Sequence, residues 1–209
     1  MDNFSITKYG KPLDESLYWI DLENKVFRSL ESSLVLDFGN LDSWAFKTGP
    51  FCTFKTAMHC TFITESNCTF LTGGGCNFTT QNDCTFKTGH DCTFKTNGNC
   101  MFDTQYGCTF ITRGHCTFNT GENCTFNTDY CCTFRTANDC TFETGQGCVF
   151  LIDCYCTLTT GYNCTFSLWD INNHTFKNYD GHSTIFDRID NKRYVLSEEL
   201  IKMLKIKNG

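Results

Sequence analysis

The chain has 209 residues, an apolar fraction of 40%, two prolines and a formal net charge of −6. These values suit one domain of ordinary size. They exclude an intrinsically disordered chain, whose fraction of apolar residues would be far lower. No apolar run approaches the ~20 residues of a membrane-spanning helix, so we expect no membrane association. Met1-Asp2-Asn3-Phe4 does not begin a charged and then apolar secretory signal, and we therefore expect an intracellular protein that is not secreted.

Residues 1–35 lack the repeat that dominates the rest of the chain. Tyr18–Leu22 and Lys25–Arg28 flank Glu23-Asn24, a pattern that predicts a β-hairpin. The open end of a repeat protein exposes its core and unpaired strand edges unless something covers them. We therefore interpret residues 1–35 as an N-terminal cap in preference to a separate functional module.

A cysteine occurs every eight residues from Cys52 to Cys164, so that fifteen copies of one octapeptide follow one another. The segment from Cys84 to Asp91 shows the octapeptide most clearly, as Cys-Thr-Phe-Lys-Thr-Gly-His-Asp. A fixed short period of this kind indicates a repeat architecture. Degenerate copies that start at Leu36 and Trp44 extend the predicted repeat region to residues 36–171.

Positions 1, 3 and 5 of the octapeptide alternate with positions 2 and 4, as do residues on the two faces of a strand. The Cys and Phe positions predict a core face, whereas the variable position 4 predicts an exposed one. Positions 6 to 8 are rich in Gly, Asn and Asp, which suit a tight corner. The unit is thus predicted to be a five-residue strand and a three-residue corner. The predicted core ladder comprises Cys84, Phe86, Cys92, Phe94, Cys100 and Phe102. The candidate outward face comprises Thr85, Lys87, Asp103, Thr133 and Arg135.

One octapeptide cannot close a coil, because its strand would have no partner across the core. Two octapeptides give a sixteen-residue coil with two facing parallel sheets, and three would give a triangular coil. Cys and Phe fill a thin two-sided interior at normal density and would leave a triangular one empty. We therefore predict an all-β, two-sheet parallel β-solenoid with about eight and a half coils. In it Phe86 stacks on Phe70 and Phe102, whereas a triangular coil would place Phe86 beside Phe110.

Residues 172–209 predict a C-terminal cap of short strands and a terminal helix. His174–Lys177 is a frame-shifted echo of the repeat. Ser183–Arg188 and Arg193–Leu196 predict two strands joined by a turn at Asp190-Asn191. Ser197 is a good helix N-cap, and acids follow it in the first turn, where the helix dipole favours them. Leu200, Ile201 and Leu204 would share the apolar face of this helix.

Seventeen cysteines suggest disulfides or zinc, but the spacing favours reduced thiols that pack as small apolar groups. Neighbouring ladder cysteines would lie at the ~4.8 Å strand spacing, wider than the ~3.8 Å between the Cβ atoms of a disulfide. A line of sulfurs also does not form the tetrahedron that zinc requires. Cys131 and Cys154 lie off the ladder and are predicted to occupy opposite edges, as are His59 and His115. We expect no metal site.

No phosphate-binding loop, nucleophile elbow or paired His and carboxylate spacing stands out from the repeat. We therefore expect no enzyme, no catalytic residues and no cofactor. Six basic residues are spread among the acids of residues 36–171, so neither a basic stripe nor a continuous acidic track forms, and we do not expect direct nucleic-acid binding.

The motif Gly-x-x-Cys-Thr-Phe-x-Thr, as in Gly121–Thr128, resembles uncharacterised repeat proteins of bacteriophages and large DNA viruses. This resemblance covers residues 52–167 and implies a location in the cytoplasm of an infected cell or in a virion. The octapeptides are more loosely similar to those of ice-nucleation proteins, which also pair into sixteen-residue coils. In that family Thr-x-Thr places two threonines on one face, whereas Thr93 and Thr96 are three residues apart.

Three functions remain open. The first is a structural or interaction protein, a monomer or small oligomer that presents Thr-rich faces to a protein partner. The second is a binder of ice or glycan through ladders at Thr61/Ile63, Thr109/Ile111 and Thr157/Thr159. The third is an acidic decoy for a nucleic-acid-binding protein.

Overall fold

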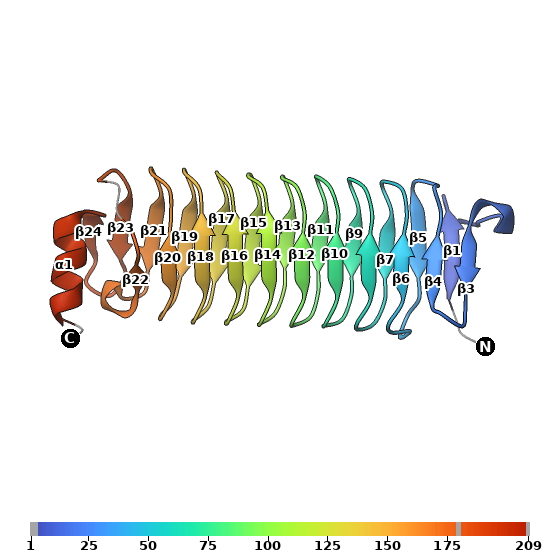
Figure 1. Ribbon diagram of the computed structural model, residues 1–209, viewed down its shortest axis with the longest axis horizontal. Coiled ribbons are helices and arrows are strands. Elements are labelled where there is room, and N and C mark those ends of the chain that lie inside the picture. The colour runs from blue at the N-terminus through green and yellow to red at the C-terminus, as the bar shows by residue number, and fades with distance from the viewer. Residues whose placement is uncertain (1–3, 179–180, 208–209) are drawn as a thin grey trace.

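The computed structural model describes residues 4–178 and 181–207. It is an elongated stack of coils with the N-terminal strands at one end and helix α1 at the other (Figure 1). Over the described residues, thirteen strands form sheet A and eleven form sheet B, and successive strands of the repeat alternate between the two sheets. The predicted two-sheet parallel β-solenoid is therefore confirmed. No helix of the described residues is long and apolar enough to cross a membrane.

Within the repeat, strands that are neighbours in one sheet are two elements apart in the sequence. Sheet A contains β2 (Lys11–Pro12), β1 (Ser5–Lys8), β5 (Leu34–Asp37), β7 (Thr53–Lys55), β9 (Thr69–Leu71), β11 (Thr85–Lys87), β13 (Met101–Asp103), β15 (Thr117–Thr120), β17 (Thr133–Thr136), β19 (Val149–Ile152), β21 (Thr165–Leu168), β23 (Thr184–Asp187) and β24 (Lys192–Val195). Sheet B contains β22 (Thr175–Phe176), β20 (Thr157–Thr159), β18 (Thr141–Thr144), β16 (Thr125–Thr128), β14 (Thr109–Thr112), β12 (Thr93–Lys95), β10 (Asn77–Thr79), β8 (Thr61–Ile63), β6 (Ala45–Lys47), β4 (Val26–Arg28) and β3 (Trp19–Asp21). The helical segments are η1 (Glu15–Leu17), η2 (Ile171–Asn173) and α1 (Glu198–Lys207).

The phenylalanines pair every sixteen residues. Phe86 lies opposite Phe70 and Phe102 in sheet A, and its ring stacks on that of Phe102 with centroids 4.9 Å apart. Across the core it meets Phe94 of sheet B edge-on, at 5.1 Å and an interplanar angle of 74°. The predicted sixteen-residue coil is confirmed, and Phe110 pairs with Phe94 in sheet B and not with Phe86. Two interlocked columns of rings fill the interior.

The strands are shorter than predicted. In the regular repeats each strand covers positions 2 to 4 or 2 to 5 of the octapeptide, which is three or four residues instead of five. The alternation of burial still runs from position 1 to position 5, as in Cys92, Phe94 and Thr96, which are all buried. Position 1 lies just before each strand, and its carbonyl still bonds to the next coil, as Cys92 accepts from the Thr109 N–H at 2.9 Å. Its side chain points inward.

Position 8 is the point at which each corner turns. Its backbone is left-handed in all fifteen corners from Phe51 to Asn163, whereas positions 6 and 7 have no positive φ there. This conformation lets its N–H donate along the stack to the next coil, as Asp91 does to the Tyr106 carbonyl at 3.0 Å. Asn, Asp and Gly tolerate the left-handed region, which explains their frequency at this position.

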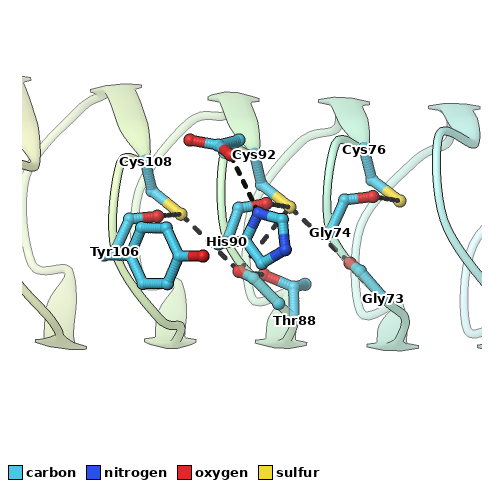
Figure 2. A network of polar contacts seen from close by, with 10 residues as sticks. Gly73, Gly74, Cys76, Thr88, His90, Cys92, Tyr106 and Cys108 are labelled. Carbon is cyan, nitrogen blue, oxygen red and sulfur yellow. Dashed lines mark hydrogen bonds and ion pairs between the residues drawn. The ribbon is translucent and has the colours of Figure 1, made fainter.

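Each ladder cysteine satisfies carbonyl groups at the inner side of a corner. The Cys92 Sγ donates to the His90 carbonyl at 3.4 Å and to the Gly73 carbonyl of the preceding coil at 3.7 Å (Figure 2). A thiol fits this place because it is apolar enough for the core and still a weak donor. At Cys68, the neighbouring thiols of Cys52 and Cys84 together with burial raise the pKa above the ordinary value of a thiol.

Antiparallel strands cover the N-terminal end. β3 pairs with β4 in sheet B, which confirms the predicted hairpin, and β1 pairs with β5 in sheet A. Trp44 occupies the Cys position as predicted, since Phe46 pairs with Phe62. Leu36, however, lies in the Phe position and not the Cys position, because it pairs with Phe54, eighteen residues away. The two extra residues lengthen the corner before Trp44, so the register shifts while apolar residues still face the core.

The C-terminal end has a matching cover. β23 and β24 form the predicted antiparallel hairpin, and α1 begins directly after Ser197, whose Oγ accepts a hydrogen bond from the Leu200 N–H. Leu200 and Leu204 are buried and Ile201 packs against the same core. The predicted helix and its apolar face are therefore confirmed.

The parallel stack is longer than the regular repeat. Ten parallel strands stand in each sheet over the described residues, from β4 and β5 to β22 and β23, where eight and a half coils were predicted. At both ends, coils of eighteen or nineteen residues continue the pairing without the eight-residue spacing. The division into residues 1–35, 36–171 and 172–209 describes that spacing, and as a domain division it stays a prediction.

Candidate interaction surface

The five candidate residues of the outward face all lie on sheet A and are all exposed. Thr85 and Thr133 belong to the column that position 2 forms along the stack. Lys87, Asp103 and Arg135 belong to the column of position 4. Side chains alternate between the two faces of each strand, so a strand that buries its Phe at position 3 exposes the side chains at positions 2 and 4. The structure therefore brings these side chains onto one flat surface.

Asn119 was not predicted to take part in this surface, although it lies between two of the candidates. It pairs with Asp103 on one side and Arg135 on the other, and its Nδ2 donates to the Asp103 Oδ1 at 3.0 Å. This bond fixes one carboxylate of the column. The position was recognisable from the sequence, since Asn119 follows Asp103 by one sixteen-residue coil. Lys87 and Arg135 make no ion pair with the described residues.

Sheet B carries the three Thr ladders of the second hypothesis, at residues 61/63, 109/111 and 157/159. Its position 2 column is threonine in six consecutive strands. These are Thr93, Thr109, Thr125, Thr141, Thr157 and Thr175. The column of position 4 beside it is mixed, with Lys95, Ile111 and Glu143. Position 5 is buried, as at Thr96, so the continuous outward threonine column of sheet B consists of position 2 residues alone.

The predicted core ladder contributes nothing to this surface. Its cysteines and phenylalanines are at most 2% exposed. They set the spacing of the outward columns, because stacking along the core keeps successive coils in register.

The corners carry a feature that the sequence analysis did not identify. The His90 ring stacks on the Tyr106 ring of the next coil at 5.0 Å, and its Nδ1 lies 2.8 Å from the Asp91 Oδ2 (Figure 2). Gly74 of the preceding coil leaves room for the imidazole, since a Cβ there would lie 2.8 Å from the His90 carbonyl oxygen and 3.1 Å from a ring carbon. The ring is thus held in place at one edge of the solenoid.

The off-ladder groups lie as predicted. Cys131 is exposed in a corner that leads from sheet B to sheet A, and Cys154 is half-buried in a corner that leads from sheet A to sheet B. His59 and His115 likewise occupy opposite edges. Within the described part of the chain, no three His, Cys, Asp or Glu side chains are grouped so that they could hold a metal ion.

Comparisons with known proteins identify no relative. No protein-family model, no curated protein and no solved structure matches the chain.

Proposed function

We propose that the protein is a non-enzymatic structural or interaction protein, a rigid rod that presents the outward faces of its sheets to a protein partner. One observation carries this proposal. The inward positions repeat almost unchanged, whereas position 4 changes in charge and size from coil to coil, as in Lys87, Asp103, Asn119 and Arg135 on sheet A. A regular scaffold with an irregular surface suits a partner that recognises one particular stretch.

The covered ends favour a discrete particle over an open fibre. Antiparallel strands and helix α1 close the stack, and covered edges prevent strand-to-strand association. We therefore propose a monomer or small oligomer that needs no cofactor. The resemblance to repeat proteins of phages and large DNA viruses is the basis for proposing a viral setting, in the infected cytoplasm or the virion.

Charge reversal on sheet A tests the proposal. Lys87→Glu, Asp103→Lys and Arg135→Glu together should abolish affinity capture of the partner from infected cells without changing the melting temperature, because all three side chains are exposed. Lys95→Glu on sheet B changes the net charge by the same −2 and is the matched control, which should retain the partner. Catalytic turnover by the purified protein, or full capture after the outward faces of both sheets are scrambled, would contradict the proposal.

The unbroken threonine column of sheet B supports a second candidate function, binding of a regular surface such as ice or a glycan. Threonine presents a methyl and a hydroxyl at each strand spacing of ~4.8 Å. The mixed column beside it makes this the weaker candidate. Thermal hysteresis or glycan binding that disappears when Thr109, Thr125 and Thr141 are changed to Lys would establish it.

A further inference from the structure

A shallow pocket of about 390 Å³ lies on the outward side of sheet B at its N-terminal end. Its walls come from Leu17 and Tyr18 before β3 and from Leu30 after β4, and Trp19 forms its apolar surface. Leu30 is 96% exposed and Trp19 is 51% exposed, a cost in free energy that a soluble surface normally avoids. The volume falls in the range of sites for small ligands, which are mostly apolar with a few polar groups.

Two cations stand side by side in this pocket. Arg28 of β4 lies directly opposite Lys47 of β6 in the parallel ladder, and both line the pocket. Like charges in directly opposed positions destabilise a sheet. Neither side chain makes an ion pair with the described residues. The two cations therefore have no carboxylate in direct contact among the described residues.

The opposite end of the solenoid shows what a compensated arrangement looks like. The Arg188 guanidinium lies 5.5 Å from the Trp169 ring, much as Arg28 lies 5.4 Å from that of Trp19. Arg188, however, binds the Asp153 carboxylate at 3.1 Å. The Arg188 cation is thus paired with a carboxylate of the protein itself. Arg28 and Lys47 have no such ion pair among the described residues.

We propose that this N-terminal pocket binds a small organic anion with an apolar tail. The carboxylate or phosphate of the ligand lies against Arg28 and Lys47, where one anion neutralises both cations, and the tail covers Leu17, Trp19 and Leu30. Charge-assisted hydrogen bonds to guanidinium and ammonium groups are the strongest polar contacts available at such a site. The pocket lies at the N-terminal end of sheet B, whereas the charge reversals that test the protein partner lie on sheet A, so either proposal can fail without the other.

The indole N–H signals of the three tryptophans report binding in a ¹⁵N-edited NMR titration of the full chain. Octanoate and octyl phosphate are the probes, and whichever binds more tightly identifies the preferred head group. We expect the Trp19 signal to shift in a saturable way while those of buried Trp44 and neutralised Trp169 stay in place. Inorganic phosphate should bind at least tenfold more weakly because it lacks the tail. Octylammonium should not shift the Trp19 signal because its head group carries the wrong charge.

Arg28→Gln with Lys47→Gln should weaken binding of the preferred probe at least tenfold, and Leu30→Ser should weaken it severalfold. All three side chains are exposed and the Arg28–Lys47 pair is repulsive, so the variants should not lower the melting temperature. Lys95→Gln removes a cation from the same column of sheet B and should leave binding unchanged. An unmoved Trp19 signal, equal binding of octylammonium, a parallel shift of Trp169, or unchanged binding in the double variant would each overturn the proposal.

Discussion

Each phenylalanine of the regular repeat from Phe62 to Phe134 touches four other rings. Phe94 stacks on Phe78 and Phe110 at 4.8 and 4.9 Å, and it meets Phe86 and Phe102 edge-on at 5.1 and 5.2 Å. Both geometries are the favoured ones for aromatic pairs, since they bring a ring edge or an offset face against the π-cloud. A single ring therefore links two coils in its own sheet to two strands of the other.

Phe94→Ala should lower the free energy of unfolding by roughly 3–5 kcal/mol, because it removes a buried ring and leaves a cavity that the stacked neighbours cannot close. Chemical denaturation followed by far-UV circular dichroism measures the loss. Thr93→Ala, an exposed neighbour on the same strand, is the control and should cost less than about 1 kcal/mol. Equal losses for the two variants would mean that the ring columns do not hold the coils together.

Tyr155 is a residue at which the sequence departs from what its corner favours. It occupies position 8 with φ +57°, a left-handed conformation that is strained for a bulky side chain. Tyr155→Gly should raise stability by about 0.5–1 kcal/mol, since relief of the strain exceeds the added entropy of the unfolded chain. Tyr162, at position 7 with no positive φ, provides the comparison, because the same change there should destabilise the protein. Thermal denaturation of both variants measures the difference.

At the scale of elements, the residue just before strand β22 is an unusual substitution in the repeat. Its pairing with β20 places His174 where the octapeptide has cysteine, next to Cys156. The imidazole is 5% exposed, and neither ring nitrogen has a hydrogen-bond partner among the described residues. Burial lowers the pKa of His174 to about 4. The C-terminal cap therefore requires a neutral histidine.

This requirement predicts acid sensitivity. The folded-state pKa lies below the ordinary value of 6.5, so the unfolded chain binds a proton first as the pH falls. The contribution of neutral His174 to the free energy of unfolding is fully present above about pH 6.5. It is lost progressively as the pH falls to about 4, and the total loss is about 3 kcal/mol. Denaturation at pH 7 and at pH 4.5 measures the loss, which includes contributions from other groups.

His174→Cys isolates the histidine contribution, because it restores the residue that the repeat uses at this place. The variant should lose less stability than the parent between pH 7 and pH 4.5. An identical pH dependence in the two proteins would show that His174 is solvated and titrates normally.

The whole molecule is a stack of about ten coils in which each coil contacts only its neighbours, so whole coils are interchangeable. Deletion of residues 92–107 removes one coil and should preserve a cooperative thermal transition, since every later strand keeps its sheet. Deletion of residues 92–99 moves every later strand to the opposite sheet, and the C-terminal cap then meets the wrong partners. We expect this shorter deletion to broaden the transition and expose apolar surface. A better-folded eight-residue deletion would contradict the sixteen-residue coil.

Sequence alone predicted the repeated part of the structure in detail. Cys92, Phe94 and Thr96 are buried because the two-residue alternation puts position 1, 3 and 5 side chains on the inner face. Lys87, Asp103 and Arg135 share one face because packing density selects a coil of two octapeptides over one of three. The hairpin at Glu23-Asn24 and the helix after Ser197 were also predictable, since turn residues and capping residues act locally. Each of these features depends on neighbours that the repeat or the local chain specifies.

Tertiary structure decided what happens where the spacing fails. The register of Leu36, the burial of His174 in a cysteine position and the meeting of Trp19, Arg28 and Lys47 all lie in coils of eighteen or nineteen residues or in the caps beside them. Within the regular repeat, neighbours sixteen residues apart are nearly identical, so the pairing partner is known in advance. At the ends, extra corner residues make several registers possible, and the one that forms is the one that buries the available apolar side chains against the last regular coil.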